Sequence, residues 1–74
     1  MNVRWNPARM SQLEAAVSRH HRVVLHRRGT EYVVVAQALR TRGREEILVG
    51  RLPVTGEDLE FVLGELESFL VLEQ

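Results

Sequence analysis

The chain has 74 residues, no cysteine and a formal net charge of zero, and 45% of its residues are hydrophobic. This length suits one domain with a small core, and the composition is that of a globular protein rather than a disordered one. The lack of cysteine excludes disulfides and thiolate metal sites. The short apolar runs exclude a membrane span, and no apolar signal-peptide core stands near the N-terminus, so we expect a cytoplasmic protein.

The first predicted element is a helix over about residues 7–19. Asn6-Pro7 is a typical helix start, because Asn caps free backbone N–H groups and Pro fits the first helical position. Trp5 before the cap and Met10 after it have the spacing of a hydrophobic staple. Apolar side chains then recur every three or four residues, as one buried face of a helix requires.

Three strands are predicted next, over about residues 22–28, 31–40 and 45–52. Turn signals at Gly29 and Gly43 separate them and predict two hairpins. In the middle strand, every residue from 32 to 36 is apolar, whereas a half-solvated antiparallel strand alternates apolar and polar positions. We therefore expect this sheet to be covered on both faces, by a barrel interior on one side and by a helix or a second subunit on the other.

The acidic end of the chain, residues 57–72, has two interpretations. Its apolar side chains form one stripe at helical spacing, although Gly64 in mid-helix would cost about 1 kcal/mol relative to Ala. The same residues also fit two strands, at about 58–63 and 68–72, joined by a tight turn at 64–66. Periodicity alone leaves both interpretations open.

The segment from Leu59 to Val71 is similar to the ending of Sm-like and SH3-like small β-barrels, where a helical turn joins strands four and five. Over about residues 10–72 the chain resembles WYL-type regulatory domains, with Glu46-Ile47-Leu48 at the position of the Trp-Tyr-Leu triplet. It also resembles bacterial Sm-like RNA-binding proteins in helix and strand lengths. The resemblance implies a barrel surface that binds oligonucleotides or nucleotides. Only the fold is carried over, because the diagnostic residues of both families differ here.

The expected fold is thus mainly β with one N-terminal helix and a small five-stranded Sm/SH3-like barrel. The alternative is an α+β fold in the order α-β-β-β-α, with a three-stranded antiparallel meander and a last helix. That second order resembles double-stranded-RNA-binding domains.

Catalysis and metal binding lack a supporting motif. The serines stand in no nucleophile elbow or triad pattern, and the five glycines are isolated, so they form no phosphate-binding loop. His20, His21 and His26 have no carboxylate or cysteine partners at zinc-site spacing. We expect a protein that is not an enzyme and that uses no metal or cofactor.

Charge is distributed unevenly along the chain. Residues 1–51 hold ten Arg and four Glu, a formal charge of +6, and residues 52–74 hold six acids and no base, a charge of −6. Such polarity suits an anionic partner or contact between copies of the chain. Arginine grips phosphate with two parallel hydrogen bonds. Six arginines at predicted strand ends and hairpin tips are candidates for binding anions or nucleic acid: Arg22, Arg27, Arg28, Arg40, Arg42 and Arg44.

We therefore expect a non-catalytic binding or assembly module that associates with itself, as a homo-oligomer, or with another protein. The alternative is a regulatory module that binds nucleic acid or a nucleotide through the arginine-rich surface.

Overall fold

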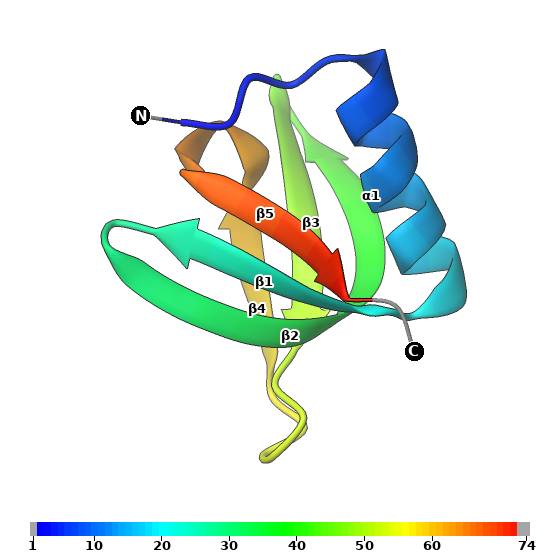
Figure 1. Cartoon of the computed structure of the whole chain (residues 1–74), viewed down its shortest axis with the longest axis vertical. Helices are drawn as coiled ribbons and strands as arrows, with labels where there is room; N and C mark the ends of the chain where they lie inside the picture. Colours follow the sequence, from blue (N-terminus) through cyan, green and yellow to red (C-terminus); the bar gives the residue numbers. More distant parts are fainter. Residues whose placement is uncertain (1, 73–74) are drawn as a thin grey trace.

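The computed structural model describes residues 2–72, which form one helix and one sheet (Figure 1). Helix α1 spans Pro7–Arg19 and is followed by five strands: β1 (Arg22–Arg27), β2 (Thr30–Arg42), β3 (Glu45–Arg51), β4 (Asp58–Val62) and β5 (Ser68–Leu72). A single 3-10 turn, η1 (Leu63–Glu65), joins β4 to β5. All pairings are antiparallel, in the order β4-β3-β2-β1-β5. The predicted fold of one helix followed by five strands is confirmed.

The alternative fold with a last helix does not occur. Phe61 on β4 pairs with Leu48 on β3, and Phe69 on β5 pairs with Leu25 on β1, so both halves of the acidic segment are extended. The apolar residues of this segment fit a helical and a strand periodicity equally well, and pairing with distant strands selects the extended conformation. The expected barrel, however, is not closed, because β4 and β5 form the two edges of a single open sheet.

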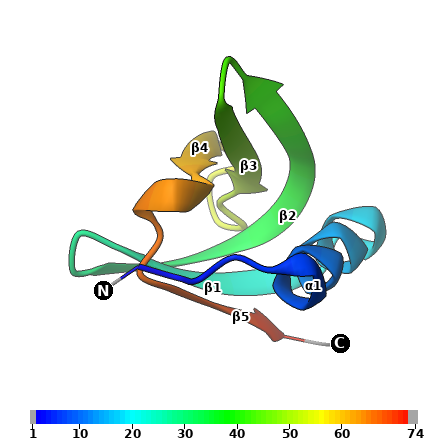
Figure 2. The ribbon, with the colours of Figure 1, turned by 90° about the horizontal axis from the view of Figure 1, so that it is seen from above.

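The sheet curls because of one irregularity in its longest strand. The register of β2 against β3 shifts between Ala36 and Ala38, as a β-bulge does. The first half of β2 pairs with β1 and the second half with β3, and Figure 2 shows β2 bending upward between these two partners. One strand of 13 residues therefore serves both halves of the sheet.

The core fills the inside of this curl. Alternate residues of the strands point inward, and α1 contributes Leu13 and Ala16 to the same cluster. The other fully or nearly buried members are Val23, Leu25, Val34, Ala36, Leu48, Phe61, Leu63 and Leu66. Among residues 2–72, no helix is long and apolar enough to cross a membrane.

The ends of α1 follow the sequence signals. The Asn6 side chain accepts a hydrogen bond from the Arg9 backbone N–H at 2.8 Å, as an N-cap does. At the other end, His20 adopts a left-handed conformation (φ 53°), and its Nδ1 lies 3.0 Å from the Ala36 carbonyl oxygen on β2. The helix therefore ends directly against the bend in the sheet.

Trp5 makes contacts that the staple spacing does not predict. Its ring stacks on Phe69 of β5 with the centroids 5.0 Å apart, and its Nε1 donates to the Leu63 carbonyl oxygen at 2.9 Å. Nearby, the Val3 backbone N–H donates to the Leu66 carbonyl oxygen at 2.8 Å. The segment before the helix is thus attached to the turn between β4 and β5.

Candidate functional site

A continuous apolar area lies on the side of the sheet that faces away from the core. The strand register places Leu70 of β5, Val24 of β1 and Val33 of β2 next to one another in a row across three strands. We name this side of the three strands the outer face. It consists of three rows, each with one residue from β5, β1 and β2 in that order. The rows are Ser68, His26 and Glu31; Leu70, Val24 and Val33; and Leu72, Arg22 and Val35.

The apolar side chains of the outer face remain in contact with solvent. Leu70 is 60% exposed, Val33 39% and Leu72 37%, whereas their strand neighbours on the inner side are in the core or packed against it. The helix does not cover them, since Leu13 and Ala16 pack into the core on the opposite side. Scattered apolar residues are normal on a monomer, but adjacent ones across three strands are typical of a binding surface.

The two polar rows of the outer face differ in charge. In one row, His26 lies between Ser68 and Glu31: Nδ1 is 2.8 Å from the Ser68 hydroxyl and Nε2 is 3.3 Å from a Glu31 carboxylate oxygen. The opposite row contains Arg22, which forms no side-chain hydrogen bond or ion pair with residues 2–72. The outer face therefore has an acidic end, an apolar middle and a basic end.

Three of the six candidate arginines are occupied within the chain. Arg27 lies over the Phe61 ring at 4.8 Å and donates to the Glu60 carbonyl oxygen at 3.2 Å, so it links β1 to β4 across the curl. Arg42 holds the Glu60 carboxylate with hydrogen bonds of 2.9 and 3.0 Å. Arg28 lies 3.9 Å from Glu65, in a largely exposed pair.

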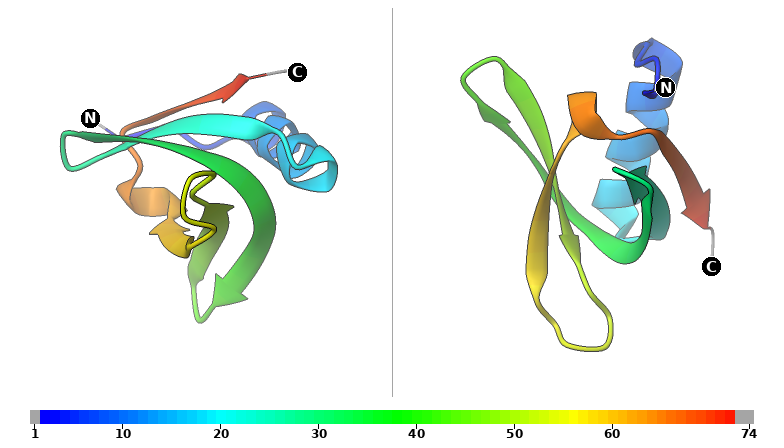
Figure 3. Two further views of the ribbon diagram at one scale, coloured as in Figure 1. Left: turned by 90° about the horizontal axis from the view of Figure 1, so that it is seen from below. Right: turned by 90° about the vertical axis from the view of Figure 1, so that its left-hand side faces the viewer.

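The other three candidates, Arg22, Arg40 and Arg44, form no ion pair with the described part of the chain. The structure does not bring the six together. The β1–β2 hairpin and the β2–β3 hairpin carry most of them and point in different directions (Figure 3). Five of them lie at strand ends or hairpin tips, as the sequence pattern predicted, and Arg40 lies inside β2, but the sheet distributes them over the molecule.

The opposed charges of the two parts of the chain meet inside one molecule. Arg51 donates to Asp58 at 2.9 Å across β3 and β4, and this hydrogen bond, together with the carboxylate charge, raises the pKa of the Arg51 guanidinium. With the Arg42–Glu60 and Arg28–Glu65 pairs, three acids of the last 23 residues have arginine partners of the same chain. Each of these exposed pairs contributes little to stability. Their side chains are nevertheless already engaged within the chain and are not free to bind another molecule.

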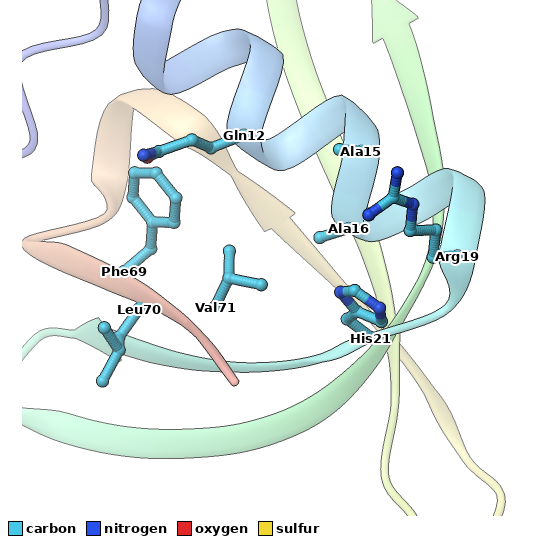
Figure 4. A pocket seen from close by; sticks show the side chains of 8 residues that line it. All are labelled: Gln12, Ala15, Ala16, Arg19, His21, Phe69, Leu70 and Val71. Atoms are coloured by element: carbon cyan, nitrogen blue, oxygen red, sulfur yellow. The ribbon is translucent and has the colours of Figure 1, made fainter. Parts of the chain in front are cut away.

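A groove of about 290 Å³ runs between α1 and the edge strand β5 (Figure 4). Ala15 and Ala16 line it on the helix side, and Val71 lines it on the strand side. Arg19 and His21 lie near each other at one end. The groove is open and has no paired nucleophile and base, so it offers a shape for docking rather than a catalytic arrangement.

The three histidines lie in three different places. His20 ends the helix, His21 lies in the groove and His26 is on the outer face. Within residues 2–72, no group of three or more His, Cys, Asp or Glu side chains is arranged to hold a metal ion.

Comparison of the chain with models of known protein families found no match, and comparisons with curated proteins and with solved structures found none either. The fold defines a small α+β protein with one helix and a five-stranded antiparallel sheet. The resemblance to Sm-like, SH3-like and WYL-type domains therefore rests on the order of the elements alone.

Proposed function

We propose that the protein is a non-catalytic assembly module and that its outer face binds a protein surface, first of all a second copy of this chain. The apolar middle row carries this proposal, because Leu70 and Val33 are exposed on either side of the half-buried Val24. Removing apolar surface from water contributes about 25 cal/mol per Å² and drives most protein association. A second copy would supply the covering that the apolar residues of β2 require on this side.

Two further observations support assembly over catalysis. Arg28, Arg42 and Arg51 have carboxylate partners within the chain, whereas Leu70 and Val33 of the middle row remain exposed. The order of helix, four strands, 3-10 turn and last strand also supports a likeness to Sm-like and SH3-like domains, a fold class of binding modules. Both observations concern the surface and the architecture, and neither requires a catalytic residue.

Self-association should appear in sedimentation velocity as a sedimentation coefficient that rises with protein concentration. Replacing both Val33 and Leu70 by Thr should weaken association about tenfold or more, because polar hydroxyls replace apolar groups in the contact. Thr keeps a β-branched shape at position 33, so the strand is retained.

The matched control is Val54→Thr, because Val54 is 96% exposed in the loop between β3 and β4 and lies outside the outer face. This variant should associate as the unmodified chain does. A chain that sediments as a monomer at all concentrations up to the solubility limit would disprove the proposed function.

A second function, nucleic-acid binding, is favoured by one observation. Arg22, Arg40 and Arg44 have no ion pair within residues 2–72, and a free guanidinium fork matches a phosphate group.

Fluorescence anisotropy with short labelled RNA and DNA should then show binding at low ionic strength that falls steeply with added salt. Arg40→Gln and Arg44→Gln together should weaken it, whereas Arg51→Gln, whose side chain is paired with Asp58, should weaken it less. Absence of binding at low salt would remove this function.

A further inference from the structure

We infer that the second copy docks face to face on the outer face through a two-fold axis that runs across the strands. Arg22 of each chain then lies against Glu31 of the other. This inference rests on the proposed function and adds the orientation of the two copies and the polar contacts that fix it.

The order of the rows carries the inference. Along the strands, the outer face has the acidic row with Glu31, then the apolar middle row, then the basic row with Arg22. A two-fold axis along the middle row places the two middle rows on each other and exchanges the outer rows. The basic row of each copy therefore meets the acidic row of the other, and the interface is self-complementary.

The other simple arrangement is unfavourable. If the two-fold axis ran along β1, each row would face its own copy, so Arg22 would meet Arg22 and Glu31 would lie opposite Ser68, without a cationic partner. Like charges in contact disfavour an association by several kcal/mol in general, which is why complementary charges select one register. The charge order therefore disfavours this second orientation.

The side chains can span the gap between two facing sheets. Packed sheets lie about 10 Å apart, and neighbouring strands about 4.8 Å apart. Arg22 would face His26 of the other copy, with Glu31 of that copy one strand to the side. The Glu31 side chain is 60% exposed and contacts His26 through Oε1, so its second oxygen is free to accept from an incoming guanidinium.

The size of the face predicts a weak dimer. Three strands span roughly 14 Å and five residues roughly 17 Å, so each copy covers a few hundred Å² at most. Stable complexes bury about 800 Å² per partner. We therefore expect reversible association that grows with concentration, in which the loss of two charge pairs is readily measured.

Charge reversal tests the orientation. Arg22→Glu and Glu31→Arg should each weaken association at least about tenfold, because each replaces two attractive contacts of the two-fold interface with two repulsive ones. Mixing the two variant chains should restore association to within about threefold of the unmodified chain. In that mixed dimer both contacts again join an arginine to a glutamate. Circular dichroism of each variant checks that the fold is retained.

The control for net charge uses helix positions that are not part of the outer face. Arg9→Glu and Glu14→Arg change charge by the same amounts, on exposed side chains of α1. Each should associate as the unmodified chain does, alone and when mixed. If the Arg22→Glu and Glu31→Arg chains do not recover on mixing, the orientation is wrong even though Val33→Thr with Leu70→Thr still weakens assembly. If the unmodified chain is monomeric, the proposed function and the orientation fail together.

Discussion

Replacing Gly50 by Ala should lower the free energy of unfolding by at least about 2 kcal/mol. Gly50 lies on β3 opposite Ala36, at the bend of β2. A Cβ atom at this position would lie 2.5 Å from Cγ2 and 2.9 Å from Cβ of the buried Val34, and 3.4 Å from Cε2 of Phe61. Since Val34 is fully buried, it cannot move aside without displacing the core, and the added methyl group has to push β2 and β3 apart.

Urea unfolding followed by circular dichroism measures this change, and Gly64→Ala is the matched control. Gly64 lies in η1, where an added Cβ meets nothing within 4 Å. The control should leave stability unchanged or raise it slightly, because Ala restricts the unfolded chain more than Gly does. Equal midpoints for Gly50→Ala and the unmodified chain would contradict the close packing of position 50 against Val34.

Replacing Phe61 by Ala should have the largest effect of any single change, about 3–5 kcal/mol. Phe61 has no exposed surface, meets Tyr32 edge to face with centroids 5.2 Å apart, and lies beneath the Arg27 guanidinium. A 74-residue chain has a total stability of roughly 4–11 kcal/mol. The substitution therefore removes a large part of the stability, and it also removes one of the two aromatic rings that the Arg27 guanidinium contacts.

Thermal unfolding by circular dichroism should show a strongly lowered midpoint for Phe61→Ala, or no cooperative transition. Leu70→Ala is the comparison, since Leu70 is apolar and lies on a neighbouring segment but is 60% exposed. Its effect on the monomer should stay within about 0.5 kcal/mol. Similar losses for the two variants would mean that Phe61 is not the centre of the core.

Local signals in the sequence were sufficient for the first two thirds of the fold. The Asn6-Pro7 start of α1 depends only on backbone capping, and the turns at Gly29 and Gly43 have φ values of 76° and 61°, which glycine adopts without strain. The acidic segment was ambiguous because its apolar residues fit both periods. Only pairing with β3 and β1, far away in sequence, distinguishes them.

The candidate site was predictable in part. The unbroken apolar stretch in β2 indicated a sheet with two apolar faces, and Val33 indeed lies outward while Val34 is in the core. The sequence did not place Leu70 beside it, because that contact requires β5 to pair with β1. Arg27 was assigned to an exposed cluster, although it continues the inward alternation of Val23 and Leu25 along β1. That alternation was the signal that would have found its contact with the core.

The strand at the edge of the outer face, β5, follows the other four strands in the sequence. Its partner β1 lies more than 40 residues earlier, whereas β1–β2 and β2–β3 are hairpins that close locally. Long-range pairing is the slower step in folding, because a large loop has to be ordered first. The outer face therefore gains Leu70 and Leu72 only when this long-range pairing forms, after the local hairpin that supplies its other two strands.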